Sequence, residues 1–134
     1  MKHTIIILLA LVFMGFSGCN ESAKTEKKSS QSIIITTTGM LADAVKNIVQ
    51  DSAKVGSLMG PGVDPHLYKA SHGDISQLTT ADVIIYNGLH LEGKMGEVLQ
   101  KVAKIKPVIA AGEYIPIEGR RQSSTYKGTY DPHV

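Results

Sequence analysis

The chain has 134 residues, of which 43% are hydrophobic, and a formal net charge of +2. A charge this small gives no indication of a nucleic-acid partner, because proteins that bind nucleic acids usually carry a strongly basic surface. The only cysteine is Cys19, so an internal disulfide is excluded. The roughly 100 residues after the polar N-terminal part can bury a modest core.

Residues 1–18 have the layout of a secretory signal peptide. Residues 5–16 are almost continuously apolar, and small residues follow them. This run is shorter than the about 20 apolar residues that a membrane span requires. The tetrapeptide Phe-Ser-Gly-Cys at 16–19 resembles a bacterial lipobox, so we expect cleavage before Cys19 and a lipid thioether on it. An ordinary signal peptide with a spare thiol is the alternative.

Residues 19–32 are expected to form a lipidated, flexible tether. They are rich in lysine, serine and threonine and contain no large apolar residue. Such a segment cannot bury enough apolar surface to order itself. We therefore expect a folded body at the cell envelope, anchored by lipid on the periplasmic or extracellular face of a membrane.

Residues 33–134 are expected to form one α/β lobe. Runs of β-branched residues predict strands, and apolar residues at helical spacing predict the helices between them. Alternation of strands and helices predicts a four-stranded parallel sheet with helices on both faces. The expected strands are 33–37, 54–59, 83–86 and 108–110, and the expected helices are 40–50, 74–80 and 94–104; residues 113–130 are expected to be loop-like.

The segment 60–68, Gly-Pro-Gly-Val-Asp-Pro-His-Leu-Tyr, predicts a rigid loop that presents His66. A metal ligand must be held in this way, although a tight turn that merely ends in a histidine is the alternative. The tripeptide 64–66, Asp-Pro-His, recurs at 131–133. Ligands of parallel α/β sheets gather at the carboxyl ends of strands, where this loop and the turn 87–90 both begin.

Three segments together carry a family resemblance: 60–68, 82–92 with the sequence DVIIYNGLHLE, and 130–134 with the sequence YDPHV. They resemble the solute-binding lipoproteins of manganese/zinc ABC transporters, the cluster A-I binding proteins. The resemblance implies two α/β lobes joined by a long helix, with one metal ion between them. Of four protein ligands, it assigns one to His66 and one to His133. The linking helix, the second lobe and the other two ligands would follow Val134.

The resemblance implies an extracytoplasmic, monomeric receptor that captures Mn²⁺ or Zn²⁺ and delivers it to an ABC permease, without catalysis. Zinc-specific members often carry a loop rich in histidine and acidic residues before the second ligand. Residues 118–130 contain no histidine. We therefore favour manganese, with zinc or ferrous iron as alternatives. A lipid-anchored surface adhesin with the same fold is the alternative function. A hydrolase is disfavoured because no Gly-x-Ser-x-Gly elbow is present.

The remaining polar candidates have structural explanations beside functional ones. His90 is expected at the edge of the site rather than on the metal, and His72 at the start of a helix, solvated or capping. Asp64 and Asp131 either orient the histidines or serve as turn residues. We expect structural roles for Tyr68 and Glu92. The methionines Met40, Met59 and Met95 are expected to fill the core.

Overall fold

The structure is a computed structural model that describes residues 31–125 and 127–133. The expected signal peptide, the lipid attachment site Cys19 and the tether up to residue 30 lie outside the described residues. Among the described helices, none is long and apolar enough to span a membrane.

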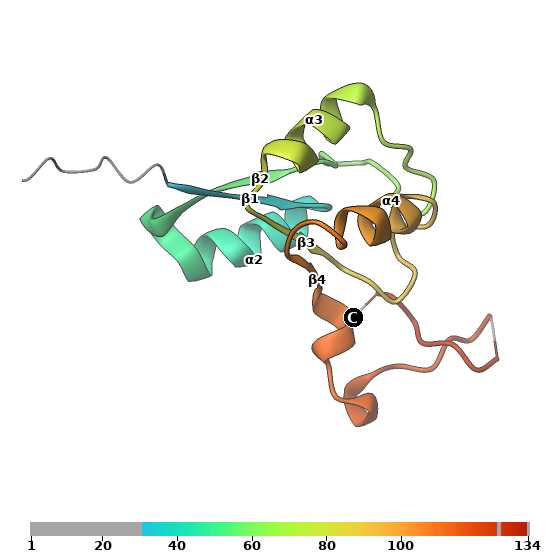
Figure 1. Cartoon of the computed structure of the whole chain (residues 1–134). Coiled ribbons are helices and arrows are strands. Elements are labelled where there is room, and N and C mark those ends of the chain that lie inside the picture. The colour runs from blue at the N-terminus through green and yellow to red at the C-terminus, as the bar shows by residue number, and fades with distance from the viewer. Residues whose placement is uncertain (1–30, 126, 134) are drawn as a thin grey trace, which may run out of the picture.

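Four parallel strands form the sheet, as the sequence predicts, in the order β2-β1-β3-β4. The chain order alternates strands and helices, and Figure 1 shows this arrangement. All seven expected elements are present, with boundaries shifted by up to two residues. They are β1 (Ser32–Thr36), α2 (Gly39–Val49), β2 (Ala53–Ser57), α3 (His72–Thr80), β3 (Val83–Tyr86), α4 (Met95–Val102) and β4 (Val108–Ala110).

Helix α2 covers one face of the sheet, and α3 and α4 cover the other (Figure 1). Ile35 of β1 and Ile84 of β3 are register partners and therefore point to the same face. There they pack with buried residues of α3 and α4, namely Leu78, Met95 and Leu99. Met59 and Met95 are buried as expected. Met40 is 77% exposed, so its expected place in the core is wrong.

Local side-chain bonds set the helix starts. The Oγ1 atom of Thr38 accepts a bond from the backbone N–H of Leu41 at the start of α2. At the start of α3, Ser71 and Asp74 form a reciprocal capping box, which is why this helix begins two residues before its expected first residue. His72 is exposed at the first helical position, and the capping is done by Ser71.

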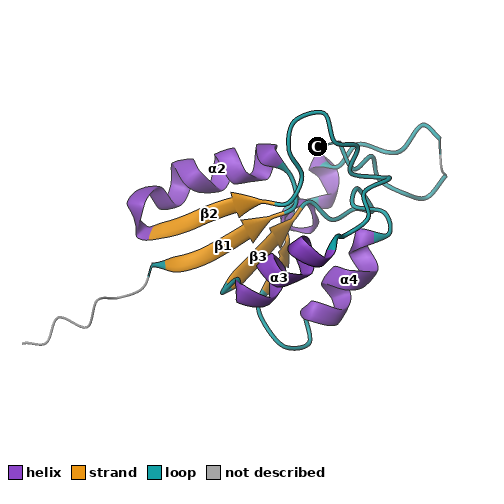
Figure 2. Cartoon of the chain, turned by 90° about the horizontal axis from the view of Figure 1, so that it is seen from above, coloured by secondary structure: helices purple, strands orange, loops and turns teal. Residues whose placement is uncertain are grey.

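The segment after β4 returns the chain to the carboxyl ends of the strands. It contains two short 3₁₀ helices, Ala111–Tyr114 and Ile117–Gly119, where only loop was expected. An antiparallel bridge pairs Gln122 with Tyr130. The guanidinium of Arg120 lies 5.3 Å from the centre of the Tyr130 ring. Figure 2 shows the loops gathered where the strands end, and this edge carries the candidate site.

Candidate metal centre

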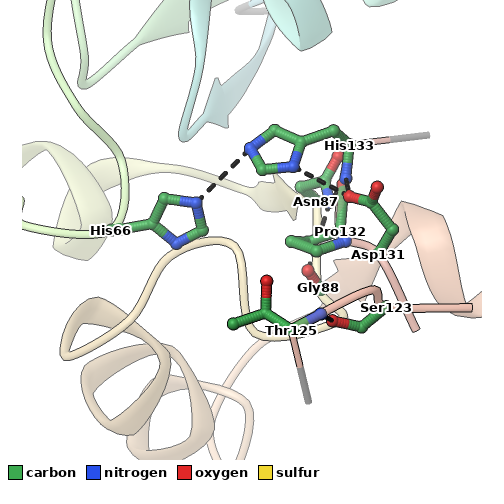
Figure 3. Close-up of polar contacts among 8 residues, drawn as sticks. All are labelled: His66, Asn87, Gly88, Ser123, Thr125, Asp131, Pro132 and His133. Carbon is green, nitrogen blue, oxygen red and sulfur yellow. Dashed lines mark hydrogen bonds and ion pairs between the residues drawn. The ribbon is translucent and has the colours of Figure 1, made fainter. Parts of the chain in front are cut away.

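The imidazoles of His66 and His133 lie side by side at this edge of the sheet (Figure 3). His66 belongs to the loop after β2, and His133 lies near the end of the chain, 67 positions later. The two Nε2 atoms are 3.4 Å apart. The ring centres are 5.4 Å apart and the ring planes meet at 65°. Both side chains are exposed, so an ion could reach them from solvent.

The separation of these nitrogens is close to the bite of a tetrahedral metal ion. Two Zn–N bonds of about 2.0–2.1 Å, opened at a tetrahedral angle, place their nitrogens about 3.4 Å apart. The observed 3.4 Å is longer than an ordinary hydrogen bond to nitrogen, so direct pairing of the two rings would be weak. The geometry therefore fits a shared cation better than it fits a hydrogen bond.

Each histidine follows an aspartate-proline pair that forms the same local turn. The backbone N–H of His66 donates to Oδ1 of Asp64 at 2.9 Å. The backbone N–H of His133 donates to Oδ1 of Asp131 at the same distance. Such Asp turns fix the backbone immediately before the imidazole. The repeated tripeptide therefore has a structural meaning: it produces the same bend twice.

Asp131 also contacts the ring that follows it. The Nδ1 and Oδ1 atoms of His133 and Asp131 are 2.8 Å apart (Figure 3). Hydrogen bonds from the backbone N–H and then from the ring of His133 lower the pKa of the Asp131 carboxyl below its usual value. A carboxylate at Nδ1 fixes the proton there and leaves the Nε2 lone pair available to a cation.

The loop that carries His66 is fastened to the start of α3 by Tyr68. Its hydroxyl donates to Oδ2 of the buried Asp74 at 2.7 Å. Burial, followed by this bond and the charge of Asp74, raises the pKa of Tyr68 to about 12. Burial alone would raise the pKa of Asp74, but hydrogen bonds from Ser71 and Tyr68 outweigh it and lower that pKa. This anchor gives Tyr68 the structural role that the sequence predicts.

A third segment, the turn Asn87–Gly93, lies between the two histidine segments and touches both. Its backbone is left-handed at Gly88, Leu89, His90 and Gly93, with φ values of 79°, 52°, 68° and 46°. Left-handed geometry at residues with a Cβ costs roughly 1–2 kcal/mol each, so other contacts must hold this turn. Figure 3 shows Asn87 and Gly88 next to Pro132 of the His133 segment.

Glu92 supplies those contacts from a fully buried position. Its side chain is 1% exposed. Its Oε1 atom accepts from the hydroxyl of Thr37 at 2.7 Å and from the backbone N–H of Asn87 at 2.6 Å. Its Oε2 atom accepts from the backbone N–H of Gly88 at 3.1 Å. The structural role expected for Glu92 is confirmed, but its partners Thr37, Asn87 and Gly88 were not predicted; the run of threonines at the end of β1 was the available signal.

Of the other two described histidines, His90 lies near this pair and His72 lies away from it. His90 lies on the Asn87–Gly93 turn and lines, with both imidazoles, a cavity of about 530 Å³. His72 lies at the start of α3 and is exposed. Within residues 31–125 and 127–133, no group of three or more His, Cys, Asp or Glu side chains could hold a metal ion. The described part of the site therefore brings two imidazoles together and no third side chain of these types that could share an ion with them.

Comparison with known proteins points to metal-uptake components. The family described as "Zinc-uptake complex component A periplasmic" matches residues 34–134. The manganese-binding lipoprotein MntA of Bacillus subtilis is 46% identical over 130 residues, covering 96% of this chain and 42% of that protein. The zinc-binding protein TroA of Treponema pallidum is 49% identical over 112 residues, covering 84% of this chain and 36% of TroA.

A solved structure of the periplasmic zinc-binding protein TroA from Treponema pallidum is also similar in fold. It superposes with a TM-score of 0.71 at 51% identity. The match covers 78% of this chain and 37% of that one. The chain thus spans less than half the length of the relatives that it matches.

Proposed function

Because the chain belongs to the family of periplasmic zinc-uptake complex component A, we propose that it is a metal-binding receptor. In this proposal it captures Mn²⁺ or Zn²⁺ outside the cytoplasm and delivers the ion to an ABC permease, without catalysis. The observation that carries the proposal is the 3.4 Å separation of the His66 and His133 Nε2 atoms. The ion is cargo rather than a resident cofactor, and His66 and His133 would be two of its ligands.

The chemistry of the donor set supports a borderline or hard divalent ion. Neutral imidazole nitrogen suits zinc, iron and manganese, and additional carboxylate ligands shift preference towards manganese. Two imidazoles alone bind weakly, so the full affinity requires further ligands. We favour manganese because residues 118–130 contain no histidine that could collect zinc. Of the two relatives described above, MntA is named for manganese binding and TroA for zinc binding.

The N-terminal segment completes the proposal. Residues 1–18 would be removed, Cys19 would carry the lipid, and a monomeric body would be held at the cell envelope. The relative MntA is named a lipoprotein, which agrees with this arrangement. Mass spectrometry of the mature protein should find a lipid thioether on Cys19, and Cys19→Ala should release the protein from the membrane. A soluble wild-type protein with a free thiol would contradict the anchor.

Equilibrium dialysis with elemental analysis tests the metal site on the full-length protein. Wild type should take up one equivalent of Mn²⁺ or Zn²⁺. His66→Ala and His133→Ala should each lose it, because each removes one of the converging ligands. His72→Ala provides a matched control, since it removes an exposed histidine at the start of α3. Undiminished metal content in His66→Ala would refute the assignment.

Competition between the two ions decides the cargo. Dialysis against Mn²⁺ and Zn²⁺ at equal free concentrations shows which ion the protein prefers. Uptake of a radioactive isotope of that ion into cells then shows whether the protein delivers it. Uptake that depends on this protein and on a permease supports a transport receptor. Stoichiometric metal without any contribution to uptake would contradict delivery while leaving the binding site intact.

A further inference from the structure

The Asn87–Gly93 turn lies between the two histidine segments, and this position gives it influence over both. On one side, the Nδ2 group of Asn87 donates to the backbone carbonyl of Pro132 at 2.9 Å (Figure 3). That carbonyl belongs to the residue before His133, so the bond fixes the position of the second imidazole. The same Nδ2 group donates to the carbonyl of Gly88 at 3.1 Å, which ties the amide to the turn itself.

On the other side, Gly93 lies directly against the backbone of His66. A Cβ atom at position 93 would overlap the carbonyl oxygen of His66 and make a tight contact with its carbonyl carbon. The φ of Gly93 is 46°, a left-handed conformation that favours glycine. The absence of a side chain therefore allows the loop carrying His66 to pack onto the turn. One turn thus contacts the main chain of both histidine segments.

Glu92 holds this turn in its left-handed shape. Its buried carboxylate binds the first two backbone N–H groups of the turn and the hydroxyl of Thr37, which follows β1. Thr37 is itself fully buried and joined by backbone bonds to Ile85 and Met59. The carboxylate therefore connects the turn to the central part of the sheet, in addition to forming bonds within the turn.

We propose that Glu92 is the positioning residue of the metal site: through the Asn87–Gly93 turn it sets the separation of the His66 and His133 imidazoles. This inference rests on the proposed metal site but concerns a residue that touches no ion. Glu92 acts on His133 through Asn87 and Pro132, and on His66 through Gly93. Its loss would let both segments drift and would widen the 3.4 Å bite.

Glu92→Gln is the direct test because it preserves size. An amide places a donor where Glu92 now offers an acceptor. Its NH₂ group would face either the N–H of Gly88 or both the N–H of Asn87 and the hydroxyl of Thr37, so donor would meet donor. We expect metal affinity to fall about 10–100-fold, the usual effect of losing an outer-sphere partner. Asn87→Ala removes the side-chain bonds to Pro132 and Gly88 but leaves the carboxylate of Glu92 and its donors in place, so it should weaken affinity less. Combining the two substitutions should give less than the product of their effects, because both act along one path.

A second, metal-free measurement separates positioning from general weakening of the fold. Nuclear Overhauser effects between the ring protons of His66 and His133 report the approach of the rings, whose centres are 5.4 Å apart. These effects should disappear in Glu92→Gln and persist in Lys106→Met. Lys106 donates from Nζ to the carbonyls of Leu78, Thr79 and Ala81 at 2.8, 2.6 and 2.6 Å, away from the site. Its removal should lower the melting temperature while leaving affinity unchanged.

If Glu92→Gln folds poorly, Thr37→Val provides a milder variant, since it removes one donor to the carboxylate and leaves the other two. It should weaken affinity several-fold, and Thr37→Ser, which keeps the hydroxyl, should restore it. The proposal is overturned if Glu92→Gln keeps wild-type affinity and the ring contacts. It is also overturned if Lys106→Met, at an equal drop in melting temperature, loses affinity to the same extent. If wild type binds neither metal, the proposed function fails, and the ring contacts alone then decide whether Glu92 positions the imidazoles.

Discussion

The two Asp-Pro-His segments have the same local turn but different surroundings. In both, the histidine N–H donates to the aspartate two residues earlier at 2.9 Å. Asp131 additionally contacts the ring of His133, whereas within the described residues Asp64 has a bond to the backbone of His66 and none to its ring. The tripeptide therefore determines the bend of the chain, but not how its imidazole is oriented.

The longer-range anchors differ as well. The first segment is fastened through Tyr68 and Asp74 to the start of α3. The second is fastened through the Asn87 side chain to the turn after β3. Two copies of one short motif are therefore held in different ways. The first is held from the helix that follows it, and the second depends on a segment about 45 residues earlier.

Gly93→Ala should have the largest effect, because it acts on the first segment through a backbone collision. The new Cβ would overlap the carbonyl of His66, and the left-handed φ would be strained. We expect the free energy of unfolding to fall by at least about 2 kcal/mol, together with a loss of metal binding. Chemical denaturation and dialysis would measure both effects.

Gly96→Ala is the matched control for this substitution. Gly96 lies in α4, and a Cβ added there meets nothing within 4 Å. Alanine should leave stability unchanged or raise it by up to about 1 kcal/mol, because glycine is a poor helix former. Equal stability of the two alanine variants would show that Gly93 does not support the His66 loop.

Much of the architecture could be predicted because its determinants are local. Unbroken apolar runs such as 83–86 indicate strands covered on both faces, and the structure has β3 at these residues. Helix α3 began earlier than expected because the reciprocal bonds of Ser71 and Asp74 were not recognised in the sequence. The exposed Met40 shows the limit of helical spacing, which identifies an apolar stripe without showing what covers it.

The geometry around the histidines was less accessible to sequence reasoning. The repeat of Asp-Pro-His indicated which residues to compare, but the contacts that hold them join distant parts of the chain. Thr37 and Glu92, for example, are separated by 55 positions. No local pattern indicates that a buried carboxylate will accept a hydroxyl from another strand end. Such pairings depend on strand order, which follows from the whole fold.

Asp131→Asn should have a larger effect on metal affinity than Asp64→Asn, although the two substitutions are chemically the same. Only Asp131 contacts its imidazole, at 2.8 Å, and an amide there supports the required ring tautomer poorly. We expect about a 10–100-fold loss for Asp131→Asn and a loss of only a few-fold for Asp64→Asn. Titration calorimetry with Mn²⁺ and Zn²⁺ would measure both. Equal losses would mean that both aspartates act only through the backbone turn.

Tyr68→Phe should have the smallest effect, because it removes a single hydroxyl, with its short bond to Asp74 and its longer one to the carbonyl of Leu58, from the anchor of the His66 loop. Asp74 keeps its bonds from Ser71, so no buried oxygen is left without a donor. We expect the free energy of unfolding to fall by about 1 kcal/mol at neutral pH. The backbone amide shifts should change near His66 and remain unchanged near His133. Changes of equal size at both segments would contradict separate anchors.

The pH dependence of the Tyr68→Phe difference gives a further test of this anchor. The pKa of Tyr68 is raised from 10.0 to about 12, so the native state holds its proton more tightly than the unfolded state does. The stability that Tyr68 contributes is therefore complete below pH 10 and is lost as the pH rises towards 12. Because phenylalanine has no proton to lose, the advantage of wild type over the variant should shrink across this interval. Denaturation curves of both proteins at several alkaline pH values would measure it, and a constant difference would show that the phenol does not donate to Asp74 in the folded protein.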